Sequence, residues 1–351
     1  MDEIKRMLQY AFKTKNRFTF PVSAPGSAGM ETCFVNLLEP GDKAIVCQNG
    51  VFGGRMKENV ERCGATCVLI ADEWGKGVDI AKVKKAIADN AKVKAIAFVH
   101  AETSTGARSD AEAICKLAQE KGILTIVDAV TSLGGIPLEV DAWGIDAIYS
   151  GSQKCLSCAP GLSPVSFSAR AEQVIKQRNR KVQSWFMDMS LVMNYWEAQG
   201  GARTYHHTAP VNGLYGLHES LVMLKEEGLE NSWARHKKNH LALRAGIEAM
   251  GLEFLVAENE RLPQLNSIKV PAGVDEALVR KRLLADYNLE IGAGLGALAG
   301  KVLRIGLMGA SSTPNHVTLC LSALESVLPM AGAKIKAGVA LPAARAVLFP
   351  N

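Results

Sequence analysis

Short apolar runs alternate with amphipathic segments over residues 1 to about 170. Helical patterns such as DIAKVKKAIADNA and DAEAICKLAQEKG lie between most of these runs. Continuous apolar strands separated by helices are typical of a largely parallel sheet that is covered on both faces. We therefore predict an α/β fold with a mainly parallel seven-stranded sheet, in which ligands bind beyond the carboxyl ends of the strands. The predicted strands are residues 18–23, 43–48, 66–70, 93–100, 123–130, 145–151 and 163–168.

The pattern changes after about residue 225. The stretch LENSWARHKKNHLALRAGIEAMG reads as one long helix, and three short apolar runs then alternate with two further helical patterns. This order of elements predicts a second, smaller α/β unit. We expect a large domain over residues 1–225 and a small C-terminal domain over residues 226–351.

Composition and charge narrow the class of protein. The chain has 351 residues, is 48% hydrophobic and has a formal net charge of +5, and its densest basic stretch, KQRNRKVQ, is too small for a nucleic-acid-binding arm. No transmembrane helix or secretory signal is expected from the apolar runs. The eight cysteines are scattered through apolar contexts, which is typical of reduced thiols in a cytoplasmic protein. We expect no nucleic-acid or membrane partner.

Small residues follow the first predicted strand, in the stretch SAPGSAGME. A helix that begins here would offer free N–H groups and the positive end of its dipole. Gly26, Ser27 and Ala28 are therefore candidates to bind a phosphate group. The alternative is an ordinary turn between strand and helix, with Ser27 as the N-cap.

Two later strand ends also place polar side chains at the same edge. Thr103 lies in the hydroxyl-rich stretch HAETSTGARSD after the fourth run, and Asp128 closes the apolar fifth run. A buried carboxylate is costly unless it is paired or hydrogen-bonded. Asp128 either caps the next segment or faces a cationic ring nitrogen of a ligand.

The sixth run leads into SGSQKCLSCAPG, which contains Lys154 and a C-x-x-C pair, Cys155 and Cys158. No second Cys/His pair lies at ligand spacing, so the thiols do not predict a zinc site. A lysine between two apolar strands would have its ammonium pKa lowered by desolvation, as Schiff-base chemistry requires. Lysine, carboxylate, phosphate-binding turn and hydroxyl together match the needs of pyridoxal phosphate.

Several stretches carry a resemblance to a known family. The chain resembles class V aminotransferases of fold type I, and within them the alanine–glyoxylate / serine–pyruvate aminotransferase family. The resemblance runs in order from near residue 1 to about residue 330. Its main stretches are VNLLEPGDKAIVCQNGVFGGR, ETSTGARSD, VDAVTSLGG, GIDAIYSGSQK, YHHTAPVNGLYGLHESL, EGLENSWARH and GKVLRIGLMG.

The resemblance implies a role for each candidate residue. Lys154 would carry the internal aldimine and move the substrate proton, Asp128 would pair with the pyridinium nitrogen, and Arg304 would bind the substrate α-carboxylate. It also implies a homodimer with shared active sites. The remaining implied cofactor contacts are Phe52 and Val130 on the two faces of the ring, Thr103 near the phenolic oxygen, Gly26, Ser27, Ala28 and Gln153 at the phosphate, and Tyr205 and Thr208 reaching the phosphate of the partner subunit.

The implied reaction is a ping-pong transamination between alanine or serine and glyoxylate or pyruvate. A single carboxylate-binding arginine favours small monocarboxylates over glutamate or aspartate. A lyase or desulfurase of the same superfamily, or an inactive truncated member, is the alternative. The family usually has an N-terminal arm, and this sequence begins at the helix that follows it.

Two other site types find little support. The stretch GAGLGALAG could suggest a dinucleotide-binding loop, but no acidic residue follows it at the required distance. His206 and His207 are adjacent and would point to different sides, so we predict no metal site.

Overall fold

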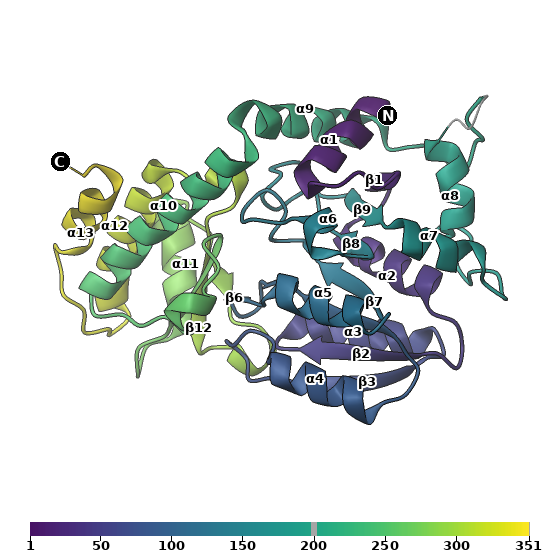
Figure 1. Cartoon of the computed structure of the whole chain (residues 1–351). Coiled ribbons are helices and arrows are strands. Elements are labelled where there is room, and N and C mark those ends of the chain that lie inside the picture. The colour runs from purple at the N-terminus through teal and green to yellow at the C-terminus, as the bar shows by residue number, and fades with distance from the viewer. Residues whose placement is uncertain (198–201, 351) are drawn as a thin grey trace.

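The computed structural model describes residues 1–197 and 202–350 (Figure 1). Its first part is built around a seven-stranded sheet with the order β1-β9-β8-β7-β4-β2-β3. The strand β9 runs antiparallel to both β1 and β8, and the neighbours from β8 to β3 are parallel. The mainly parallel sheet is thus confirmed, and all seven predicted runs form it. The strands are β1 (Phe18–Val22), β2 (Lys43–Gln48), β3 (Thr66–Ala71), β4 (Val93–Val99), β7 (Leu124–Asp128), β8 (Ala147–Tyr149) and β9 (Ser163–Phe167).

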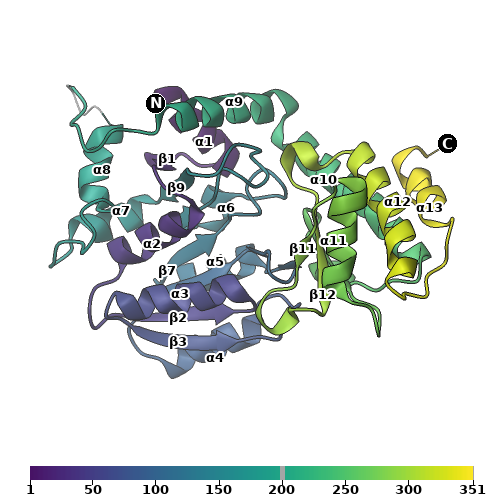
Figure 2. The same cartoon turned by 180° about the vertical axis from the view of Figure 1, so that it is seen from behind.

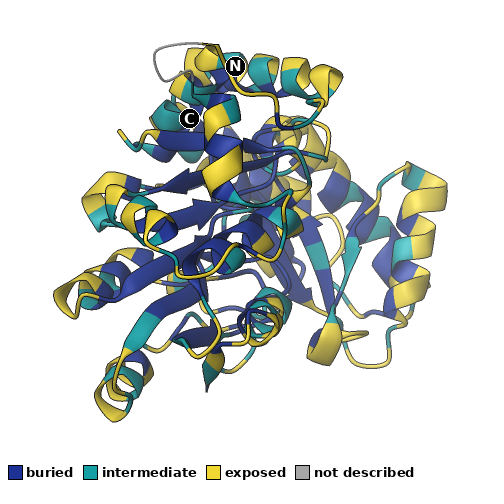
Figure 3. Ribbon diagram, turned by 90° about the vertical axis from the view of Figure 1, so that its right-hand side faces the viewer, coloured by how far each residue is buried: buried dark blue, intermediate teal, exposed yellow. Residues whose placement is uncertain are grey.

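Helices cover both faces of this sheet, because successive side chains of each strand point to opposite sides. On β2, Ala44 and Val46 pack into the core beneath one group of helices, and Ile45 and Cys47 pack beneath the other. Figure 3 shows most of the strands buried and the outer helix faces exposed. The first group is α2 (Gly26–Leu37), α3 (Val51–Arg62), α7 (Ala169–Lys176) and α8 (Met189–Trp196), and the second includes α1 (Asp2–Phe12), α4 (Ile80–Asp89), α5 (Ala111–Glu120) and α6 (Val140–Trp143).

The second part of the chain has its own sheet and its own apolar core. Helix α9 (Val211–Glu227) packs on α1 and is followed by α10 (Leu229–Ala249), which leads into the second part (Figures 1 and 2). Gly228 joins the two helices with a φ of +85°, a left-handed conformation that favours glycine. The second part contains the antiparallel strands β10 (Leu265–Lys269), β12 (Val302–Gly306) and β11 (Gly292–Ala293), with α11 (Glu276–Tyr287), α12 (Pro314–Met330) and α13 (Ala340–Leu348).

Three further findings bear on the sequence predictions. The hydroxyl-rich stretch after β4 forms a small hairpin, β5 (Ala101–Glu102) and β6 (Ala107–Arg108). All eight cysteines are free thiols. Among the described residues, no helix combines the length and the hydropathy needed to cross a bilayer.

Candidate active site

Three of the predicted turns meet at the carboxyl edge of the large sheet. A Cβ atom on Gly26 would lie 3.3 Å from Val130 Cγ2 and 3.4 Å from the carbonyl oxygen of Ser150. The turn after β1, the turn after β7 and the turn after β8 therefore touch one another. This contact places the candidate phosphate-binding residues beside those that follow Asp128 and precede Lys154.

Helix α2 begins at Gly26, with Pro25 as its N-cap. Ser27 lies inside the helix, so its alternative role as N-cap is wrong. Ala28 N–H donates to the Pro25 carbonyl at 2.7 Å. In the described part of the chain, the N–H groups of Gly26 and Ser27 have no acceptor, which is the arrangement that a helix N-terminus offers to an anion.

Arg55 adds a positive charge near this turn and was not found from the sequence. Its Nη1 lies 3.5 Å from Ser27 Oγ, and its guanidinium carbon lies 4.9 Å from the centre of the Phe52 ring. Its position three residues after Phe52 puts both side chains on the same face at the start of α3. The spacing would have been a usable signal, because residues three apart on a helix are neighbours.

Asp128 ends β7 and is 3% exposed. Its Oδ1 accepts a hydrogen bond from Val130 N–H, and its Oδ2 accepts one from the Tyr149 hydroxyl, both at 2.8 Å. Burial raises the pKa of Asp128 to about 7, although both hydrogen bonds favour the charged form. Tyr149 lies on the neighbouring strand β8 and was missed because its sequence context is simply apolar.

Lys154 is partly buried in the turn after β8. Burial lowers the pKa of its ammonium group, and the positive charge of Arg304 lowers that pKa further. Arg304 itself lies on β12, in the second part of the chain. Its Nε donates to the Ala293 carbonyl at 2.6 Å and its Nη1 donates to the Thr103 carbonyl at 2.9 Å. Lysine and arginine, 150 positions apart, are thus brought close enough for their charges to interact.

The Thr103 hairpin also fixes the start of α3. The buried Glu102 accepts hydrogen bonds from Phe52 N–H at 3.2 Å and from the Ser104 hydroxyl at 2.6 Å. A Cβ on Gly50 would overlap the Glu102 side chain, so glycine is required for this approach. Burial raises the pKa of Glu102. The position of Phe52 therefore depends on a carboxyl group that sequence reasoning missed.

The other predicted residues differ in how far they are buried. Thr103 Oγ1 is 3.2 Å from Thr131 Oγ1 in a buried contact, whereas Gln153 is exposed. Tyr205 is 74% exposed, and its hydroxyl is hydrogen-bonded to Thr208 at 3.1 Å. The structure does not bring these two side chains onto the phosphate turn of their own chain, and their role at a partner subunit stays a prediction.

Comparison with known sequences identifies the family. The family described as aminotransferase class V matches residues 14–317. The chain belongs to the class V aminotransferases. Members of this family depend on pyridoxal phosphate, so this aminotransferase is a pyridoxal-phosphate-dependent enzyme. A lyase or desulfurase is not favoured, because the matching family and the relatives below are aminotransferases.

Its relatives match over most of their own length. The alanine–glyoxylate aminotransferase of Rattus norvegicus is 39% identical over 329 residues, which is 93% of this chain and 79% of the relative. The (S)-ureidoglycine–glyoxylate transaminase of Bacillus subtilis (strain 168) is 37% identical over 366 residues, with coverages of 98% and 86%. The crystal structure of an alanine–glyoxylate aminotransferase from Nostoc sp. superimposes with a TM-score of 0.91 and 44% identity, covering 93% and 86%. The predicted family and fold are confirmed.

The residues at the carboxyl edge fit the cofactor of this family. A buried carboxylate that pairs with no cationic side chain in the described ranges suits a protonated ring nitrogen, and Asp128 is such a group. The unpaired N–H groups at the start of α2 suit a phosphate, and a lysine with a lowered pKa suits an aldehyde.

Proposed function

We propose that this aminotransferase moves an amino group between a small amino acid, alanine or serine, and glyoxylate or pyruvate, in two successive half-reactions. The relatives described above carry glyoxylate in their names, which supports that acceptor. The single observation that carries the proposal is the proximity of Lys154 to Arg304, whose positive charge, together with burial, lowers the pKa of the Lys154 ammonium group. Lys154 can lose its proton and act as an amine, while Arg304 keeps its proton and can bind a carboxylate beside it.

Lys154 is proposed as the residue that binds the cofactor covalently and moves the substrate proton. Its lowered pKa leaves a larger fraction of the amine neutral near pH 7, and a neutral Nζ can attack an aldehyde or accept a proton. Bound pyridoxal phosphate supplies the aldehyde that takes the amino group and a ring that withdraws electrons from the substrate Cα.

Asp128 is proposed to hold the ring nitrogen in its protonated form. The two hydrogen bonds from Val130 N–H and Tyr149 O–H fix the plane of its carboxylate, so the remaining lone pairs have a fixed direction. In the same proposal, Phe52 and Val130 cover the two faces of the ring, and Thr103 lies near the phenolic oxygen. The phosphate would be bound by Gly26, Ser27, Ala28 and Gln153, with the charge of Arg55 nearby.

Arg304 is proposed to bind the α-carboxylate of the substrate. Its Nε and Nη1 are engaged by two carbonyls, and within the described ranges its Nη2 has no acceptor. Those carbonyl contacts hold the guanidinium plane still, which reduces the entropy lost when a carboxylate binds. Since we assign one arginine to this role, the proposal favours substrates with a single carboxylate.

The division into two domains, 1–225 and 226–351, is part of the proposal. Separate apolar cores in the two parts support it. The break between helices α9 and α10 lies at Gly228, three residues after the predicted boundary. We also infer a cytoplasmic, reducing compartment, which the eight free thiols support.

A homodimer with shared sites is proposed as well, with Tyr205 and Thr208 acting in the partner subunit; the exposure of both side chains supports it. Mixing a Lys154→Ala protein with a Tyr205→Ala/Thr208→Ala protein should restore activity, because one site of each mixed dimer would be intact. Two inactive proteins that stay inactive when mixed would refute shared sites.

An absorption spectrum and a substrate panel test the proposed reaction. The purified protein with added cofactor should show a band near about 400 nm that the Lys154→Ala variant lacks. Turnover should be lost in that variant and kept in Lys85→Ala, which removes an exposed lysine of α4. Alanine, serine, glutamate and (S)-ureidoglycine, each with glyoxylate or pyruvate, would then identify the donor. Full activity in Lys154→Ala, or turnover with glutamate alone, would refute the proposal.

A further inference from the structure

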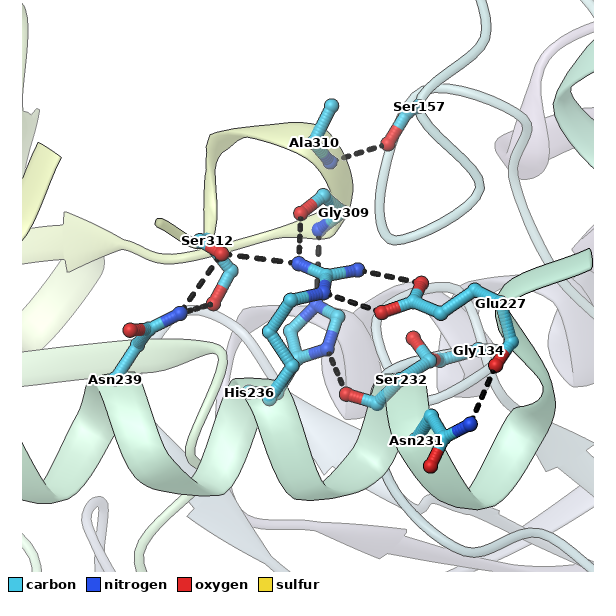
Figure 4. Close-up of polar contacts among 11 residues, drawn as sticks. Gly134, Ser157, Glu227, Asn231, Ser232, His236, Asn239, Gly309, Ala310 and Ser312 are labelled. Atoms are coloured by element: carbon cyan, nitrogen blue, oxygen red, sulfur yellow. Dashed lines mark hydrogen bonds and ion pairs between the residues drawn. The ribbon is translucent and has the colours of Figure 1, made fainter. Parts of the chain in front are cut away.

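The loop that follows the Arg304 strand is held by three residues of α10, Arg235, His236 and Asn239. Gly309 N–H donates to His236 Nε2 at 2.9 Å, and the Gly309 carbonyl accepts from Arg235 Nη1 at 2.7 Å (Figure 4). Arg235 Nη1 also donates to the Ser312 carbonyl at 3.0 Å, and Asn239 Nδ2 donates to the same oxygen at 2.8 Å. The loop from Gly309 to Ser312 is therefore fixed to a helix rather than free at the surface.

The anchoring side chains are themselves fixed. Glu227, at the end of α9, accepts two hydrogen bonds from Arg235, from Nε at 2.5 Å and from Nη2 at 2.8 Å. His236 is fully buried, its Nδ1 lies 2.7 Å from the Ser232 carbonyl, and burial lowers its pKa. A neutral imidazole that donates through Nδ1 leaves Nε2 as the acceptor for Gly309 N–H. The anchoring side chains of Arg235 and His236 are thus held by hydrogen bonds of their own.

One backbone group of this loop points away from α10, toward the turn that follows Lys154. Ala310 N–H donates to Ser157 Oγ at 2.7 Å (Figure 4). Ser157 N–H in turn donates to the Lys154 carbonyl at 3.0 Å. Ser157 has a φ of +61°, which is uncommon for a residue other than glycine. The serine hydroxyl is thus held out of the turn at some cost in backbone energy, and it reaches the loop that lies six residues after Arg304.

The approach of the two segments also requires glycine at position 309. Gly309 has a φ of +53°, and a Cβ there would overlap Ser157 Oγ and lie 2.9 Å from the Cys155 carbonyl oxygen. A side chain at this position would push the loop away from the lysine turn. The two segments are therefore in close steric contact as well as hydrogen-bonded.

We propose that Ser157 and Gly309 are positioning residues that set the place of Arg304 relative to Lys154. This inference rests on the proposed function, in which Lys154 bonds the cofactor and Arg304 binds the substrate carboxylate. Lys154 lies three residues before Ser157, and Arg304 lies five residues before Gly309 on the strand that leads into the loop. Neither Ser157 nor Gly309 touches the substrate; they act through the two turns that carry the reacting groups. Loosening their contact weakens carboxylate binding and leaves cofactor binding intact.

The test measures binding of propionate, a carboxylate without an amino group, to the cofactor-loaded enzyme by calorimetry. Ser157→Ala should weaken propionate binding by about 3- to 10-fold, the worth of a single hydrogen bond near the surface. Gly309→Ala should weaken it by more than tenfold, because overlap and the left-handed backbone act together. The affinity for pyridoxal phosphate should stay within about twofold, given that a positioning role touches no cofactor contact. Ser326→Ala, which removes a hydroxyl bonded within its own helix, is the matched control.

A second measurement separates positioning from a general loss of stability. In an Arg304→Ala background, Ser157→Ala should cause no further loss of propionate affinity, because the group that it positions is gone. A further loss in that background, or unchanged propionate affinity in both single variants, would overturn the inference. Failure of the proposed function looks different: the unsubstituted enzyme would bind the cofactor but show no propionate binding that depends on Arg304.

Discussion

Two buried aspartates lie at opposite ends of neighbouring strands, and their surroundings differ. Asp146 precedes β8 at the amino edge, and its oxygens accept hydrogen bonds from Arg170 at 2.9 Å, Thr125 N–H at 3.1 Å and the Ser168 hydroxyl at 2.9 Å. Asp128 ends β7 at the carboxyl edge and accepts hydrogen bonds from neutral donors. The chain neutralises one buried carboxylate with its own arginine and leaves the other without a cationic partner among the described residues.

The difference distinguishes a carboxylate that is buried to stabilise the fold from one that is buried at a candidate active site. A buried charge costs free energy unless a partner compensates it, and Asp146 has that partner within the fold. Burial raises the pKa of both carboxyl groups. At Asp146 the charge of Arg170 opposes this rise, whereas at Asp128 the pKa reaches about 7. Groups whose pKa is perturbed in this way cluster at functional sites. Asp128 makes no direct ion pair among the described residues, although the nearby charge of Lys154 lowers its pKa, whereas Asp146 forms an ion pair with Arg170.

The largest expected effect is the loss of activity in Asp128→Asn. The substitution keeps the shape of the side chain but removes the charge that would stabilise a protonated ring nitrogen. We expect kcat to fall by on the order of 10²- to 10³-fold, as when one preorganised electrostatic partner is removed. Steady-state kinetics at saturating cofactor measure it. Activity within threefold of the unsubstituted enzyme would show that the two aspartates do not differ in function.

The same variant should change how the stability of the cofactor-free protein depends on pH. The pKa of Asp128 is about 7 in the folded protein and near 3.8 when exposed, so the folded state binds more protons between these values. Stability contributed by this group is therefore lost as pH rises from about 4 to 7, with a slope of up to about 1.4 kcal/mol per pH unit.

Asp128→Asn removes that slope. The stability of the variant relative to the unsubstituted protein should grow from pH 4 to 7 and level off above. Denaturant unfolding at several pH values measures the difference, in which the contributions of buried histidines such as His100 cancel. A difference independent of pH would contradict the assignment.

Asp146→Asn should lower the stability of the protein and leave its activity nearly unchanged, the reverse of what we expect for the activity of Asp128→Asn. It leaves Arg170 and Thr125 N–H facing an amide that cannot accept from all of the present donors, which costs about 1–3 kcal/mol of unfolding free energy. The ratio kcat/KM should stay within about twofold at temperatures well below unfolding, because the carboxyl edge is untouched. Thermal or denaturant unfolding together with kinetics would check both halves. A large loss of activity without loss of stability would reverse the roles that we assign to the two edges.

Tyr149→Phe is expected to lower kcat by about tenfold, a smaller loss of activity than that of Asp128→Asn. The ring still fills its buried place, but Asp128 Oδ2 loses its hydroxyl donor. Since that donor favours the charged carboxylate, its removal should raise the pKa of Asp128 further. The pH at which the stability curve levels off should then move upward. A stability curve that levels off at the same pH as in the unsubstituted protein would mean that the Tyr149 hydroxyl does not affect the charge of Asp128.

The sequence predicted the strands well because each is a continuous apolar run between turn residues, as in KAIVCQ, which is β2. It also brought Asp128 and Lys154 to one edge, since parallel neighbours end together. It missed Tyr149, because a polar tip at the end of an apolar strand shows no periodic signal, and it missed Glu102, which lies in a short hairpin that the sequence pattern does not predict. The anchoring of Gly309 by α10 joins residues more than 70 positions apart, and no spacing rule in one sequence specifies such a pair.

The pairing of β1 with β9 has a consequence for synthesis of the chain. Phe18 pairs with Phe167, so about 150 further residues must be synthesised after β1 before its hydrogen-bonding partner β9 is complete. At translation rates of roughly 5–20 residues per second, that interval is on the order of ten seconds. During it, an apolar strand with the sequence FTFPV has no sheet to join. Pro21 lacks an N–H group, so it weakens any mistaken pairing of this strand with other nascent chains. In the finished sheet β1 lies at an edge, where a proline is tolerated.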